Sequence, residues 1–187
     1  DLPFYFMGQV LKTNFEYNRP STLAALGEDN GYQHLYLEGQ GKPSSLSTQF
    51  DWLVQGKFYT LTTATLMTDD MVFTRLGAND PSFNLRRDAG LMLRRNDMGN
   101  TTFVSVIEPH GSYSPVSELS LNPNSNIAEV AVLIDSDAYT AVAIKDKQKQ
   151  TSLLIIANQD GSSSKSHKVV IGNKTVRWQG PYHLVMP

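Results

Sequence analysis

Residues 48–67 read Thr-Gln-Phe-Asp-Trp-Leu-Val-Gln-Gly-Lys-Phe-Tyr-Thr-Leu-Thr-Thr-Ala-Thr-Leu-Met. Two runs rich in aromatic and β-branched residues flank Gly56, and residues of these kinds fit the pleated surface of a sheet. Glycine is common where the chain must turn tightly. The stretch therefore predicts two consecutive strands joined by a turn at Gly56.

Short apolar runs closed by turn residues continue on both sides of this stretch. Roughly a dozen strands at such spacing predict an all-β fold, an antiparallel β-sandwich. The best helix candidate is residues 21–26, with Ser21 as N-cap and Gly27 after the last turn. The expected strands are residues 2–11, 33–38, 48–54, 57–67, 71–76, 91–95, 101–108, 127–134, 139–145, 151–158, 167–171, 175–179 and 182–185.

Composition limits the classes of function. The 187 residues fit one domain, 1–187, and only 18% are charged, against a norm of about 25%. A net charge of −2 provides no basic field, so we expect no nucleic-acid partner. With no cysteine, disulfides, thiolate zinc sites and cysteine nucleophiles are excluded. No apolar run approaches the ~18 residues that span a bilayer, so no membrane span is expected.

The usual catalytic signatures are absent from the sequence: there is no phosphate-binding loop, dinucleotide fingerprint, zinc-protease motif or nucleophile elbow. The four histidines (34, 110, 167 and 183) lie far apart without the spacing of metal ligands. We therefore predict no metal ligand and no cofactor in this segment.

Residues 75–88 form a loop rich in Asn, Asp and Arg. Arg86 and Arg87 are candidate substrate-binding residues, because a guanidinium group can form two parallel hydrogen bonds to one carboxylate. The alternative is that Asp80 and Asp88 pair with these arginines inside the loop and fix its shape.

Residues 108–115 combine Glu108, His110 and Tyr113, side chains suited to acid–base work, at the end of an expected strand. His110 and Tyr113 are therefore also candidate substrate-binding residues. The alternative is a rigid turn, because Pro109 and Pro115 restrict the backbone.

The chain opens on strand-like sequence, Asp1-Leu2-Pro3-Phe4-Tyr5-Phe6-Met7-Gly8-Gln9, without the basic region of a signal peptide. We interpret this as the later part of a larger protein, with the first strands of its sandwich encoded upstream. A processed secreted domain is the alternative.

Several segments, in order, resemble the C-terminal part of alginate lyases of polysaccharide lyase family 17, in the heparinase II/III-like group. They are Asp1–Gln9, Gly31-Tyr32-Gln33-His34-Leu35, Phe58-Tyr59-Thr60-Leu61-Thr62, the loop 77–87 and residues 105–115. The resemblance covers residues 1–134.

The resemblance implies an enzyme with an N-terminal α/α toroid and a C-terminal β-sandwich. Such an enzyme cleaves alginate oligosaccharides from the end by β-elimination and releases unsaturated monouronate. The family's catalytic residues would be encoded upstream of Asp1, so we assign no catalytic residue here. A structural metal such as zinc would also be bound by that upstream part. The segment alone is expected to be inactive. Its expected partners are alginate and the toroid, and its expected location is periplasmic or secreted, in a bacterium.

Two other functions remain open. One is a stand-alone carbohydrate-binding module, which would stack sugars on exposed aromatic rings. Trp52 and Trp178 lie in expected strands, however, and are expected to be core residues. The other is a structural subunit that docks with a second chain carrying the missing residues.

Overall fold

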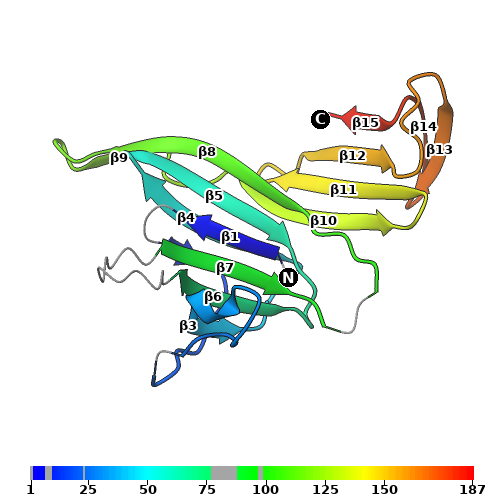
Figure 1. The fold of residues 1–187 in the computed structure, drawn as a ribbon. Coiled ribbons are helices and arrows are strands. Elements are labelled where there is room, and N and C mark those ends of the chain that lie inside the picture. The colour runs from blue at the N-terminus through cyan, green and yellow to red at the C-terminus, as the bar shows by residue number, and fades with distance from the viewer. Residues whose placement is uncertain (1, 7–9, 23, 77–87, 97–98) are drawn as a thin grey trace.

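The computed structural model describes residues 2–6, 10–22, 24–76, 88–96 and 99–187 (Figure 1). Over these residues the chain forms fifteen antiparallel strands and one short 3-10 turn, η1, so the all-β prediction is confirmed. The elements are β1 (Leu2–Phe6), β2 (Val10–Thr13), η1 (Tyr32–His34), β3 (Leu35–Gly41), β4 (Ser47–Val54), β5 (Lys57–Ala64), β6 (Asp70–Leu76), β7 (Asp88–Arg94), β8 (Ser105–Ser114), β9 (Leu119–Leu121), β10 (Ile127–Asp135), β11 (Tyr139–Asp146), β12 (Thr151–Ala157), β13 (Ser166–Ile171), β14 (Lys174–Gln179) and β15 (Tyr182–Val185).

The first part of the chain is a sandwich of two sheets (Figure 1). One sheet has the strand order β1-β7-β6-β3 and the other β2-β4-β5-β8-β9. The β4–β5 hairpin closes with Val54 opposite Lys57, so its loop has two residues. Gln55 and Gly56 have φ angles of 48° and 74°. Positive φ at both loop positions is the mark of a type I′ turn, whose twist matches that of the strands.

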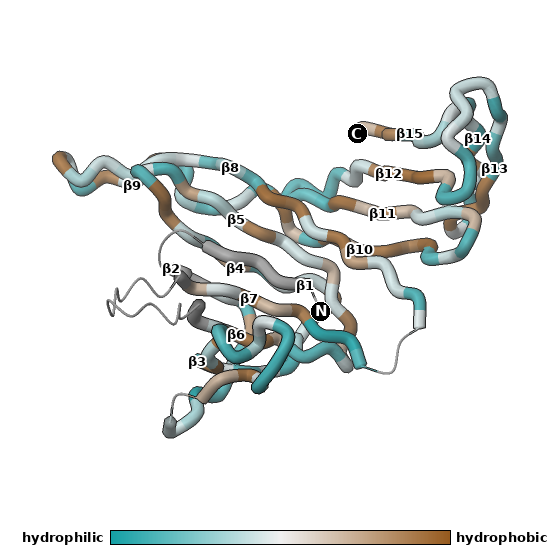
Figure 2. The backbone as a smooth tube through the Cα atoms, viewed as in Figure 1, coloured by the Kyte–Doolittle hydropathy of each residue, from teal (hydrophilic) through white to brown (hydrophobic). Residues whose placement is uncertain are grey.

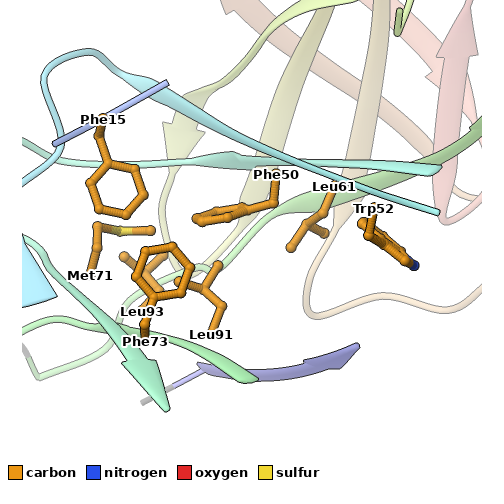
Figure 3. Packing of buried hydrophobic residues seen from close by; sticks show 8 residues of the cluster. All are labelled: Phe15, Phe50, Trp52, Leu61, Met71, Phe73, Leu91 and Leu93. Carbon is orange, nitrogen blue, oxygen red and sulfur yellow. The ribbon is translucent and has the colours of Figure 1, made fainter. Parts of the chain in front are cut away.

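The sandwich core lies between these sheets (Figure 3). Phe50 is fully buried, and the Phe15 and Phe73 rings pack edge-on to it with centroids 5.7 Å away in each case. Leu91 and Leu93, both in β7, pack into the same cluster as these rings. The alternation of apolar and polar residues along β4 and β5 therefore sends one side of the hairpin into this core and leaves the other side for a different contact.

A second apolar cluster lies in the last part of the chain. The sheet β10-β11-β12-β15 packs one face against the separate hairpin β13–β14. Trp178 is 8% exposed and joins Ala141, Ile155 and Ala157 in this cluster, while its indole Nε1 donates to the carbonyl of Gly180 at 2.9 Å. Trp52 is 9% exposed in the sandwich core. The prediction that both tryptophans are core residues is confirmed.

The other face of the β10–β11 pair lies against the sandwich. Val130 and Val142 are buried with Ala64, and Val104 and Val106 pack on the same cluster. Figure 2 shows brown, hydrophobic segments on β10 and β12, as expected of strands in contact with apolar surfaces. The outer face of the β4-β5-β8 sheet is therefore partly covered by β10.

Two local predictions are wrong. The expected strand over residues 2–11 is divided between the two sheets in its described parts, because β1 pairs with β7 and β2 pairs with β4. Residues 21–26 form no helix among their described positions. The amide of Leu26 donates to the carbonyl of Leu35 at 2.8 Å, so this segment pairs with β3 instead. A six-residue helix has too few internal hydrogen bonds to compete with such pairing.

Candidate functional site

The structure places only part of the predicted site. Arg86 and Arg87 lie outside the described residues, so their role stays a prediction. His110 and Tyr113 both lie in β8, and the turn proposed for residues 108–115 is wrong because most of this segment is strand. Proline is tolerated here because Pro109 needs no amide hydrogen for the pairing it makes with Tyr59.

A bulge in β8 sets the geometry around His110. Phe58 lies opposite His110 and Lys57 opposite Ser112, so Gly111 is an extra residue in β8. Its φ is 44°, and a Cβ at this position would lie 2.0 Å from the carbonyl oxygen of Asn122. Only glycine fits both the backbone angle and this close approach.

The His110 ring is held on three sides. It stacks on Phe58 with the ring planes 9° apart and the centroids 6.0 Å apart. Its Nδ1 lies 3.0 Å from the carbonyl oxygen of Asn122, and its Nε2 lies 2.9 Å from Oγ1 of the buried Thr60. The Thr60 hydroxyl in turn donates to Asp51 Oδ1 at 2.5 Å. Three strands, β4, β5 and β8, thus contribute to one chain of hydrogen bonds.

The directions of these bonds follow from the number of hydrogens. Thr60 has a single hydroxyl hydrogen, which it donates to Asp51, and its oxygen lies 2.9 Å from His110 Nε2. The carbonyl of Asn122 only accepts, so His110 Nδ1 donates to it. Both ring nitrogens of His110 thus have internal partners in this arrangement.

Glu108 anchors the segment that follows β9. Its carboxylate accepts hydrogen bonds from the Ser125 hydroxyl, which is 5% exposed, and from the amides of Asn126 and Ile127. This glutamate therefore serves as a fixed acceptor for backbone and hydroxyl groups. In this geometry it acts as a structural anchor rather than as an acid or base.

An open polar hollow of about 740 Å³ lies beside these groups. Lys147, from the turn after β11, contributes to it, and Tyr113 does not. A smaller hollow of about 100 Å³ shares Asn124, Ser125 and Lys147 with the first. The larger hollow is lined by Glu108, His110, Gly111, Asn122, Pro123, Asn124, Ser125, Asn126 and Lys147.

Charged groups elsewhere form surface pairs. Lys42 Nζ lies 2.6 Å from Asp70 Oδ1, and the pKa of Asp70 is lowered, first by the hydrogen bond from Lys42 and further by one from Asn96. Lys165 pairs with Asp160 at the same distance and likewise lowers the pKa of that carboxyl. Among the described residues no three His, Asp or Glu side chains converge as metal ligands would, and no helix is long and apolar enough to cross a bilayer.

Two curated relatives align with nearly the whole chain. An "Alginate lyase" of Stenotrophomonas maltophilia (strain K279a) is 36% identical over 183 residues, 97% of this chain and 24% of that protein. The "Exo-oligoalginate lyase" of Saccharophagus degradans (strain 2-40) is 30% identical over 184 residues, 96% of this chain and 25% of that protein. The chain is homologous to alginate lyases. It spans about a quarter of the length of these alginate lyases, and no family model matches it.

Several residues of the hydrogen-bond chain and of the hollow were missed from the sequence. Asp51 and Thr60 could have been paired by counting outward from a two-residue turn at Gln55 and Gly56, which places them opposite each other. Asn122, Asn124, Asn126 and Lys147 carry no recognisable motif. They reach the hollow through the pairing of β8 with β5 and the position of β10, which the sequence alone does not specify.

Proposed function

We propose that this chain is the C-terminal β-sandwich part of an exolytic oligoalginate lyase of polysaccharide lyase family 17, in the heparinase II/III-like group. The parent enzyme cleaves alginate oligosaccharides by β-elimination and releases unsaturated monouronate. The observation that carries the proposal is the 36% and 30% identity to two alginate lyases over almost the full chain.

The role of this segment is structural. β-Elimination on a uronate needs a base near the proton on C5 and groups that neutralise the adjacent carboxylate. Both ring nitrogens of His110 are engaged by Thr60 and Asn122, and Glu108 is occupied by Ser125 and two backbone amides. These bonds support a segment that braces the catalytic part of the enzyme without carrying its base.

The partner implied by this role is an α/α toroid in the same polypeptide, with alginate as substrate. The toroid would supply the catalytic residues and any structural metal. A periplasmic or secreted location fits a chain with few charged residues. A stand-alone sugar-binding module is less favoured, because Trp52 and Trp178 are buried and cannot stack on a sugar.

Activity of the complete polypeptide tests the proposal. Each elimination creates a conjugated unsaturated uronate that absorbs ultraviolet light, so cleavage can be followed directly. We expect the polypeptide that contains this chain to degrade oligoalginate and to yield monouronate from the earliest time points. Failure to cleave any alginate, or hydrolysis to saturated products, would rule the proposal out.

A further inference from the structure

The polar hollow presents four side chains that neither the fold nor the proposed function uses. Asn122, Asn124 and Asn126 alternate along the segment between β9 and β10, and Lys147 lies in the neighbouring turn. All four residues are exposed. Among the described residues these side chains have no hydrogen-bond or ion-pair partner, so their polar groups face solvent in the hollow.

The backbone that carries these groups is fixed. The carbonyl of Asn122 is bound by His110, and Asn122 itself has a φ of 48°. Ser125 is buried against Glu108, and the amide of Lys147 donates to the carbonyl of Asn126 at 2.9 Å. A ligand that bound here would therefore lose little free energy in ordering the loop.

The groups match the chemistry of an acidic sugar. An asparagine amide both donates and accepts, as hydroxyl groups require, and a lysine ammonium pairs with a carboxylate. The two acidic groups beside the hollow, Asp51 and Glu108, are occupied by Thr60 and by the Ser125–Ile127 segment. Lys147 is then the charged side chain of the hollow without an internal partner.

We propose that this hollow binds a uronate residue of an acidic polysaccharide, with Lys147 pairing with the carboxylate and the asparagine amides with ring hydroxyls. The sugar class rests on the proposed function.

The test uses the complete polypeptide in native gels that contain either alginate or alginate with its carboxylates reduced to alcohols. The slowing of the protein's migration with increasing polymer concentration gives an apparent Kd for the polymer. Two variants change the hollow: Lys147→Glu reverses its charge, and Asn124→Asp adds a carboxylate without changing the shape of the side chain. The matched controls are Lys174→Glu, at the exposed first residue of β14, and Asn173→Asp, in the exposed turn before it.

Loss of a charge-assisted hydrogen bond corresponds to about tenfold in affinity. We expect Lys147→Glu to raise the apparent Kd for alginate by about this factor and Asn124→Asp to raise it several-fold. The controls should migrate like the parent protein. With the reduced polymer, Lys147→Glu should have no effect, because the carboxylate it would repel is gone.

Equal retardation of the parent protein, Lys147→Glu and Asn124→Asp by alginate would overturn the proposal. So would an equal loss in the matched controls, because retardation would then follow net charge alone. The lyase assay is read separately. If the polypeptide cleaves alginate while the hollow variants bind normally, the inference fails and the proposed function stands. If binding depends on Lys147 but no cleavage occurs, the proposed function fails and the site stands.

Discussion

Arg95 and Asp69 form a buried ion pair, with Arg95 Nε 3.1 Å from Asp69 Oδ1 and with side-chain exposures of 5% and 0%. The same guanidinium donates to Thr101 Oγ1 and to the carbonyls of Thr102 and Ala64. This pair fastens the turn between β5 and β6 to the segment that leads from β7 to β8. Fixing that segment helps to position β8, and with it the hollow.

The same segment is also tied to the last sheet. Thr102 donates from its amide and its hydroxyl to the carboxylate of Asp135, at the end of β10, at 3.1 and 2.6 Å. Arg95 therefore hydrogen-bonds this segment to the sandwich, and Asp135 hydrogen-bonds it to β10. Together they hold the sandwich and the β10–β11 sheet in one arrangement.

Replacing Arg95 with Met should destabilise the protein by about 3–5 kcal/mol, because a buried carboxylate at Asp69 would be left without its counter-ion. Urea unfolding followed by tryptophan fluorescence measures this. The control is Lys42→Met, which breaks an exposed pair and should cost less than about 1 kcal/mol. Similar costs for the two variants would contradict the role given to Arg95.

Replacing Thr60 with Val keeps the volume of the side chain but removes the hydroxyl between Asp51 and His110. Both neighbours would lose a hydrogen bond at a buried position, at a cost of about 1–3 kcal/mol in unfolding free energy. Thr175→Val, on the exposed surface of β14, should change stability by less than about 0.5 kcal/mol. If Thr60→Val behaves like Thr175→Val, the hydrogen-bond chain does not stabilise the fold.

Gly111→Ala should destabilise the protein by more than about 1 kcal/mol, because the new Cβ would meet the carbonyl oxygens of Asn122 and Leu121 at a positive φ. Gly161→Ala is the matched control, since nothing lies within 4 Å of its Cβ position. Thermal unfolding of the two variants makes the comparison. A melting temperature that falls equally in both would argue against the bulge geometry.

The Lys42–Asp70 pair should make a small, pH-dependent contribution to stability. The folded-state pKa of Asp70 lies below its ordinary value of 3.8. Its stabilising effect is therefore fully present above about pH 4 and is lost as the pH falls through the folded-state pKa. The difference between the parent protein and Lys42→Met should shrink over this range, as urea titrations at successive pH values would show. A difference that grows on acidification would contradict this sign.

The sequence predicted the fold class, the β4–β5 hairpin and the burial of both tryptophans, because these depend on local patterns such as the turn at Gly56. The separation of β1 from β2 was missed because it depends on which sheet each strand joins. The hollow was largely missed for a similar reason. His110 was singled out by residue type, but its partners Thr60 and Asn122 reach it through strand register and the Gly111 bulge.

The most direct test of the central claim compares the complete polypeptide with residues 1–187 alone, each incubated with oligoalginate at equal molar concentration and followed by ultraviolet absorbance and mass spectrometry. We predict that the complete polypeptide releases unsaturated monouronate and that residues 1–187 release none. Steady production of unsaturated uronate by residues 1–187 alone, or the absence of cleavage by the complete polypeptide, would contradict the account.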